Sequence, residues 1–307
     1  MRRRSPGFGV PDPASVGRYL GQPEQHSGDQ AQWTLMLDGR HDPVLRDHTV
    51  DGLPTLPGTF ALEIAAEAAT VLVPGTRARA FHDTKFEAFI HARTDHPSSY
   101  TVRAAVTQRE RLDTTVRVVI TSTVTRHGRV LRADRPHFET DVTVTRSPAR
   151  APAFTPWPRQ PLAPAEDPCY RDDGIVRLSG MFRNTTECRT DNRYAAARWY
   201  PSPQLPTERL GHTVIPALLL DALIRTTALP TAVQHGPAVP HRLGHVGIHL
   251  STNDLDLAAQ HPEGIRLVAD TTRGHAVALG PDDSILAEMT GLTLAGLGSP
   301  ALSAHSW

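Results

Sequence analysis

The chain has 307 residues, of which 39% are hydrophobic and 21% charged, and its formal net charge at pH 7 is zero. This length allows a sizeable core in one large domain or two smaller ones. The balanced charge argues against nucleic acid or an anionic membrane as a partner. No apolar run approaches the ~18 residues of a membrane span, and the residues after Arg2-Arg3-Arg4 are too polar for a signal peptide. We therefore predict a cytoplasmic protein.

In the first half, a helix is expected before a series of strands. Residues 59–69 are rich in Ala, Leu and Glu, which favour a helix, and Pro57-Gly58 marks its start. Alternating apolar and polar residues then predict strands at residues 81–90, 100–107, 114–125 and 136–145, with a turn at 127–129.

A proline-rich segment is expected to divide the chain. Seven prolines between residues 147 and 168 exclude a regular helix or an internal strand, so we predict a stiff, extended linker there. The predicted organisation is a flexible N-terminal extension (1–32), a first domain (33–146), the linker (147–168), a second domain (169–297) and a C-terminal tail (298–307).

The second half repeats the layout of the first. A short helical or irregular segment at residues 170–180 and a strand at 193–199 precede a helix at 212–225, which has Pro216 in its first turn. Strands follow at residues 245–250, 264–271, 275–279 and 285–294. Two helices, each followed by antiparallel strands, indicate an α+β fold.

Cysteine and histidine patterns give no sign of a metal or of a disulfide framework. Cys169 and Cys188 are too few for such a framework, and their spacing leaves open whether they lie close together. His241, His245 and His249 recur every four residues, but interspersed glycines and a proline argue against a helix. A strand with polar edges is the better interpretation, because no carboxylate or cysteine completes a ligand set.

One stretch carries a recognisable signature. His48, Gly52 and Pro57 have the spacing HxxxGxxxxP, preceded by PVLRD and followed by a helix rich in Ala and Glu. This stretch resembles the dehydratase domains of iterative polyketide synthases and of polyunsaturated fatty acid synthases, and the resemblance covers roughly residues 35–297. It implies a double hot-dog fold, in which two antiparallel sheets each wrap a central helix.

Two residues are candidates for acid–base chemistry. His48 precedes a helix N-terminus, whose dipole favours the neutral imidazole that can take up a proton. Asp221 lies in an apolar helical segment, where a carboxylate must pair, face solvent or keep a proton. On these grounds alone, His48 could be an ordinary loop histidine and Asp221 an exposed residue of a helix. The resemblance makes His48 the catalytic base and Asp221 the catalytic acid.

Five further residues are predicted to bind substrate: Gly52, Pro57, Gly58, Gly180 and Arg225. The amide of Gly58 could hold a thioester carbonyl at the start of the helix. Arg225 departs from the family pattern, which has Gln or His four residues after the Asp, and a guanidinium there would favour the ionised carboxylate and oppose proton donation. Around Gly180 only Gly180 and Phe182 match the family motif GYxYGPxF, whose erosion suggests an altered substrate or reaction.

The resemblance implies a lyase of polyketide and antibiotic biosynthesis that dehydrates a 3-hydroxyacyl chain to the enoyl thioester. The acyl chain would arrive on the phosphopantetheine of an acyl carrier protein, with no metal or organic cofactor, and other polyketide synthase components would be partners. The arginines at residues 109–111 could attract an acidic carrier protein or be a solvated hairpin tip. We expect a free-standing enzyme acting in trans, and leave homodimer formation open.

Two other functions fit the same residues. Arg225 and the eroded motif favour an isomerase or cyclase that uses the same His/Asp pair for another proton transfer. A catalytically silent hot-dog module that binds the acyl carrier is the third possibility.

Overall fold

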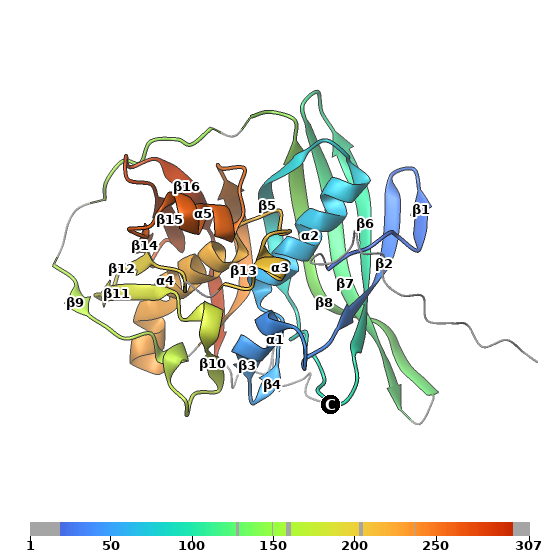
Figure 1. The fold of residues 1–307 in the computed structure, drawn as a ribbon, viewed down its shortest axis with the longest axis horizontal. Coiled ribbons are helices and arrows are strands. Elements are labelled where there is room, and N and C mark those ends of the chain that lie inside the picture. Colours follow the sequence, from blue (N-terminus) through green and yellow to red (C-terminus); the bar gives the residue numbers. More distant parts are fainter. Residues whose placement is uncertain are drawn as a thin grey trace, which may run out of the picture.

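A computed structural model describes residues 19–126, 129–148, 150–157, 161–202, 205–236 and 238–296. Within these residues, fourteen strands form one antiparallel sheet and three short strands form another (Figure 1). No helix in the described part of the chain is long and apolar enough to cross a membrane. The predicted tail (298–307) and residues 1–18 of the predicted extension lie outside the described residues.

The first half of the sheet packs against helix α2, Gly58–Leu72. Its strands, in spatial order, are β1 (Gln25–Ser27), β2 (Gln30–Leu37), β6 (Ser98–Arg109), β7 (Asp113–Arg126), β8 (Arg129–Thr145) and β5 (Arg77–Phe86). Almost the whole circumference of α2 is buried. Its many alanines make this possible, because a helix of small side chains lets the strands approach closely on several sides.

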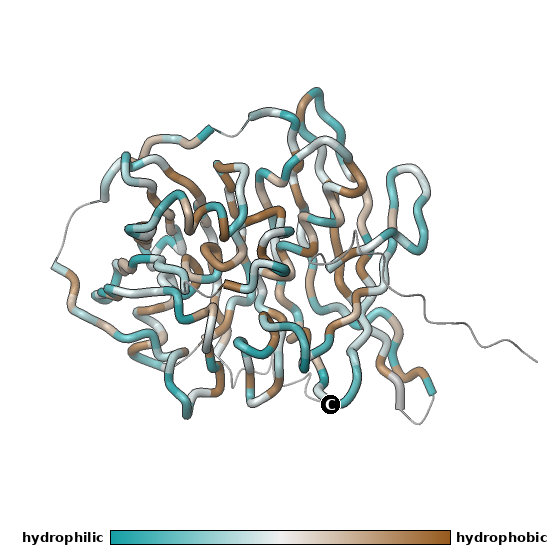
Figure 2. The backbone as a smooth tube through the Cα atoms, in the orientation of Figure 1, coloured by the Kyte–Doolittle hydropathy of each residue, from teal (hydrophilic) through white to brown (hydrophobic). Residues whose placement is uncertain are grey.

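The second half repeats this arrangement around helix α4, Ala217–His235. Its strands, in spatial order, are β13 (Ala238–Ile248), β16 (Ile285–Thr290), β15 (His275–Leu279), β14 (Ile265–Asp270), β12 (Tyr194–Trp199), β11 (Thr185–Thr190) and β9 (Ala163–Pro164). Strand β17 (Thr293–Gly296) pairs with the first part of β13. In Figure 2, hydrophobic residues concentrate in the strands and helices of both halves, and hydrophilic residues in the loops between them.

The two halves join where β5 pairs with β13. Five residue pairs connect these strands, from Arg242 opposite Lys85 to Gly247 opposite Ala80. Helices α2 and α4 also contact each other directly. A single hydrophobic core therefore runs through both halves of the chain.

Short elements also connect the two halves of the chain. Helix α1 (Pro43–Asp47) leads into β3 (His48–Val50), which pairs with β4 (Leu53–Pro54) and with β10 (Val176–Leu178) from the second half. Two 3-10 turns, η2 (Pro168–Tyr170) and η3 (Gly180–Phe182), precede and follow β10 in the sequence. Helices α3 (Thr207–Leu210) and α5 (Asp254–Gln260) complete the second half.

Several sequence expectations are wrong in detail. The predicted extension includes β1 and the start of β2, because Ala31 and Trp33 alternate into the core although their neighbours are polar. His48 begins a strand instead of lying in a loop. The last predicted strand is two strands, broken at Gly291 with its φ of 70°. Residues 127 and 128 of the predicted turn lie outside the described residues.

Three buried carboxylates fix the positions of the long helices. Glu63 of α2 accepts hydrogen bonds from the amides of Val214 and Ile215, at 2.8 and 3.0 Å, just before α4. Asp254 accepts from the amides of Leu218 and Leu219 in the first turn of α4, and Glu67 accepts from those of Tyr19 and Leu20. Each carboxylate satisfies amides that would otherwise be buried without a partner.

We expect Glu63→Ala to lower the free energy of unfolding by about 2–4 kcal/mol, because it leaves two buried amides without an acceptor. Urea unfolding measures this change. The matched control is Glu263→Ala, which removes an exposed carboxylate and should change stability by less than about 0.5 kcal/mol. Equal stabilities of the two variants would contradict the anchoring role of Glu63.

Candidate active site

The imidazole of His48 is held in one tautomer. Its Nδ1 lies 2.8 Å from the carbonyl oxygen of Thr55. A carbonyl oxygen can only accept a hydrogen bond, so Nδ1 carries the proton and the neutral ring has its lone pair on Nε2. The ring also makes an edge-to-face contact with Phe182, with centroids 5.6 Å apart. These two contacts hold the ring with Nε2 available as a base.

Burial lowers the pKa of His48 below its ordinary value of 6.5. The charge of Asp221 and the hydrogen bond to Thr55 oppose this effect, whereas Arg225 adds to it. Because the pKa is lowered, the ring is neutral at pH 7 and able to accept a proton.

Asp221 reaches the same region from α4. Its residue is 8% exposed, and its Oδ2 accepts a hydrogen bond from Nε of Arg225 at 2.9 Å. No other residue in the described part of the chain donates to this carboxylate. Oδ1 is therefore the oxygen left for another partner.

His48 and Asp221 line one cavity together. Its other walls are the start of α2, the η2 turn, β10, β13 and one face of α4, on which Arg225, Ala228, Leu229 and Ala232 follow Asp221. A second cavity adjoins it, and the residues that line both are His48, Gly58, Val176, Val239 and Pro240. Phe86, Phe89 and Phe138 give this second cavity an aromatic lining. We refer to these two adjoining cavities, both of which are lined by His48, as the apolar passage.

Gly58 and Thr59 present polar groups to this passage. Gly58 begins α2 and lines both cavities, and no residue that the structure describes accepts a hydrogen bond from its amide. An added Cβ at Gly58 would lie 2.7 Å from Cε1 of Phe86, so a side chain does not fit there without a shift. Thr59 lines the cavity of Asp221, and its buried hydroxyl has no hydrogen-bond partner among the described residues.

Three predicted substrate-binding residues lie outside the lining of both cavities. Gly52 follows Asp51 in the turn between β3 and β4, and both have positive φ angles, as a two-residue hairpin turn requires. Pro57 caps α2. Gly180 has a φ of 47°, and a Cβ there would lie 2.0 Å from the carboxylate of Asp47. In this structure the three residues shape the backbone around the site.

Arg225 lines the cavity at the centre of a hydrogen-bond network. Its Nη1 donates to Asp167, to the hydroxyl of Tyr170 at 2.9 Å and to Thr185 at 3.1 Å. Its Nη2 donates to the carbonyl of Phe182 at 3.1 Å and to Asn184 at 2.6 Å.

Sequence reasoning missed the partners of Arg225. Asp167 before Pro168 has the signature of a helix N-cap, and its Oδ1 does accept from the amide of Cys169. That signature indicates a turn, and nothing in it indicates an ion pair with a residue 58 positions away.

The two cysteines and the histidine series offer no other chemistry. Both cysteines are free. Burial raises the pKa of the Cys169 thiol, which lines the cavity, far above its usual value, so the nucleophilic thiolate does not form there. In the described part of the chain, no group of three or more His, Cys, Asp or Glu residues could hold a metal ion. His245 faces His82 on β5, and His249 pairs with Glu288 at 2.9 Å.

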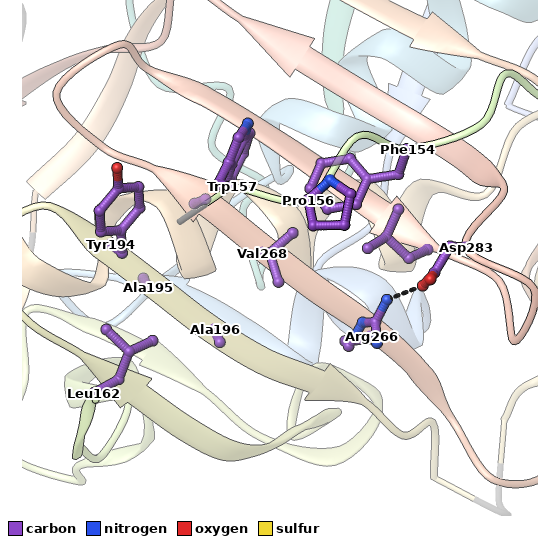
Figure 3. Close-up of a pocket in the computed structure, with 12 residues that line it drawn as sticks. Phe154, Pro156, Trp157, Leu162, Tyr194, Ala195, Ala196, Arg266, Val268 and Asp283 are labelled. Carbon is purple, nitrogen blue, oxygen red and sulfur yellow. Dashed lines mark hydrogen bonds and ion pairs between the residues drawn. The ribbon is translucent and has the colours of Figure 1, made fainter. Parts of the chain in front are cut away.

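A separate pocket lies between the proline-rich segment and the outer face of the second half-sheet. Figure 3 shows Phe154, Pro156 and Trp157 of this segment over Tyr194 and Val268 of the strands below. Its charged groups are Arg266 and Asp283, which are paired with each other and about half exposed. This pocket offers no buried acid or base, so the cavity of His48 and Asp221 is the candidate active site.

Comparison with known proteins shows which family the chain resembles. Residues 19–123 match the family model described as polyketide synthase dehydratase domain. No curated protein sequence matches the chain. The first-half signature is thus found independently by the family model, and the resemblance of the chain to polyketide synthase dehydratases is confirmed.

Solved structures extend the likeness over both halves of the chain. The dehydratase domain from the CurF module of the curacin polyketide synthase has a TM-score of 0.70 at 15% identity, with 91% of this chain and 99% of that chain covered. Two inactive mutants of the CurK dehydratase also match. The His-to-Phe mutant has a TM-score of 0.64 at 14% identity, covering 92% and 99% of the chains, and the Asp-to-Asn mutant 0.62 at 13%, covering 91% and 97%. These likenesses confirm the predicted double hot-dog fold.

We expect His48 to be neutral at pH 6.5, with its proton on Nδ1 and a titration midpoint below 6.5, because burial disfavours the imidazolium. A long-range ¹H–¹⁵N correlation spectrum of ¹⁵N-histidine-labelled protein, recorded from pH 5 to 8, measures both properties. The spectrum of His48→Gln identifies the resonance. A midpoint above 6.5, or a proton on Nε2, would contradict the arrangement.

Proposed function

We propose that the chain dehydrates a 3-hydroxyacyl thioester, carried on the phosphopantetheine of an acyl carrier protein, during polyketide synthesis. The observation that carries this proposal is the shared cavity of His48 and Asp221, each contributed by a different half of the chain. One inactive mutant of the CurK dehydratase replaces a His and the other an Asp. These mutants support a His/Asp pair as the essential groups in this fold.

The proposed reaction consists of two proton transfers, one from the α-carbon and one to the β-hydroxyl. Nε2 of His48 takes the proton from the α-carbon, and the electrons of the broken C–H bond form the double bond between the α- and β-carbons. The C–O bond to the β-hydroxyl breaks, and the oxygen leaves as water with a proton from Asp221. Return of the proton on His48 to Asp221 restores the pair. No step requires a metal or an organic cofactor.

The thioester carbonyl would be held at the start of α2. Negative charge develops on its oxygen as the α-proton leaves. Two donors that have no partner among the described residues are available there, the amide of Gly58 and the hydroxyl of Thr59. The positive end of the α2 dipole supports the same charge.

An acyl carrier protein and other polyketide synthase components are the proposed partners, because the substrate is bound to the carrier. The apolar passage suits an acyl chain, whose burial is favourable. The pairing of Asp221 with Arg225 would also fit an isomerase or cyclase, and the assay of the products distinguishes these reactions.

We expect His48→Ala and Asp221→Asn each to lower the rate of dehydration by roughly 10²–10⁴, the usual contribution of a general base or acid. Mass spectrometry of a carrier-bound 3-hydroxyacyl substrate detects the loss of one water molecule. His41→Ala is the matched control, because His41 is an exposed histidine that pairs with Asp38. An unchanged substrate mass with a shifted ultraviolet spectrum would indicate isomerisation. No change from folded protein over a broad panel of substrates would indicate a silent module.

We expect Thr59→Val to lower kcat/KM for dehydration at least tenfold, since one oxyanion donor contributes about 10²–10³ in rate. The variant should not be less stable than the wild type, because the hydroxyl it removes is buried and has no partner in the part of the chain that the structure describes. Thr70→Val is the control, since the hydroxyl of Thr70 bonds Ala66 within the same helix, outside the cavity. Full activity of Thr59→Val would show that the hydroxyl of Thr59 does not bind the thioester carbonyl.

A further inference from the structure

Every N–H group of Arg225 is engaged inside the protein. Nε donates to Asp221, Nη1 to Asp167, Tyr170 and Thr185, and Nη2 to Phe182 and Asn184. A guanidinium has five N–H donors, and these six acceptors use all of them. Arg225 lines the cavity but has no donor left for a substrate, so its effect on the reaction must pass through Asp221.

The positive charge of Arg225 is paired with two carboxylates, those of Asp167 and Asp221. Burial alone would lower the pKa of Arg225, but Asp167, Tyr170 and Asp221 together raise it well above its ordinary value, so the guanidinium stays charged. Its side chain is 10% exposed, and those of Asp167 and Asp221 are 6% and 12% exposed. One buried cation therefore lies between two buried carboxylates.

This arrangement changes what Asp221 can do. If Asp221 were the only carboxylate near Arg225, taking up a proton would leave a buried cation without a counter-ion, at a high cost in free energy. With Asp167 bound to the same guanidinium, Asp221 can take up a proton while Arg225 remains paired. The second carboxylate removes the obstacle that a guanidinium one turn away presents to proton donation.

We propose that Asp167 is a positioning residue that neutralises Arg225 and so keeps Asp221 able to donate a proton. This inference rests on the proposed function of Asp221 as the catalytic acid. Arg225 holds the Oδ2 side of Asp221 and leaves Oδ1 for the substrate. Asp167 and Arg225 together replace the uncharged Gln or His that the family pattern has four residues after the Asp.

Other charged and titratable groups around Asp221 are the same in each variant of the test. They are His48 on β3, Cys169 and Tyr170 in the η2 turn, and Asp254 at the start of α5. Asp254 already binds two amides of α4. Any change on substitution of Asp167 can therefore be assigned to the balance between Asp167, Arg225 and Asp221.

The test compares wild type, Asp167→Asn, Arg225→Gln and the double variant. We expect Asp167→Asn to lower kcat at least tenfold with KM changed less than threefold, and the double variant to regain at least tenfold over Asp167→Asn. Asp172→Asn, an exposed residue of the same loop, is the control and should keep wild-type kinetics. Full activity of Asp167→Asn would overturn the proposal. Equal losses of kcat in Asp167→Asn and in the double variant, with circular dichroism showing that both are folded, would also overturn it. Such a result would indicate a merely structural role.

A second measurement does not depend on dehydration. In ¹³C-aspartate-labelled protein, the carboxyl resonance of Asp221, identified with Asp221→Asn, should titrate at least one pH unit lower in Asp167→Asn than in the wild type. The double variant should return it toward the wild-type midpoint. If the three proteins show these titration shifts but wild type dehydrates no substrate, the proposed function fails and the role of Asp167 stands. An unchanged midpoint overturns the role of Asp167 whatever the activity.

Discussion

The pairing of β5 with β13 is the contact on which the site depends. It joins two half-sheets that otherwise wrap separate helices, and it makes one core of them. Once the half-sheets are joined edge to edge, α2 and α4 contact each other, and the buried Glu63 of α2 fixes the segment that enters α4. His48 before α2 and Asp221 in α4 then line the same cavity. Neither half could present both groups alone.

Burial of ionisable groups is costly, and this protein offsets the cost in two ways. Glu63, Glu67 and Asp254 each accept two backbone amides, which supply hydrogen bonds without a second charge. In the site, the carboxylates of Asp167 and Asp221 share a guanidinium instead. Backbone amides have fixed positions and hold elements together, whereas a shared cation lets one of two carboxylates change its charge.

The surroundings of His48 could be predicted from the sequence because they are local. The turn at Asp51-Gly52 brings the chain back within seven residues, so that the carbonyl of Thr55 meets His48 and α2 begins directly afterwards. Spacing alone can encode such a unit. The Asp221 half could be predicted only as far as its helix. Asp167, Asn184 and Thr185 lie 58, 41 and 40 positions from Arg225, and only the fold brings them together.

The polar atoms that remain unpaired define what the cavity can bind. Among the described residues, every N–H group of Arg225 has an acceptor within the protein. Nε2 of His48, Oδ1 of Asp221, the amide of Gly58 and the hydroxyl of Thr59 have no partner within the described part of the chain. In a closed core, such groups would destabilise the protein. Two possible acceptors and two donors that converge on one apolar passage are instead the arrangement expected for an acyl ligand with a carbonyl and a hydroxyl group.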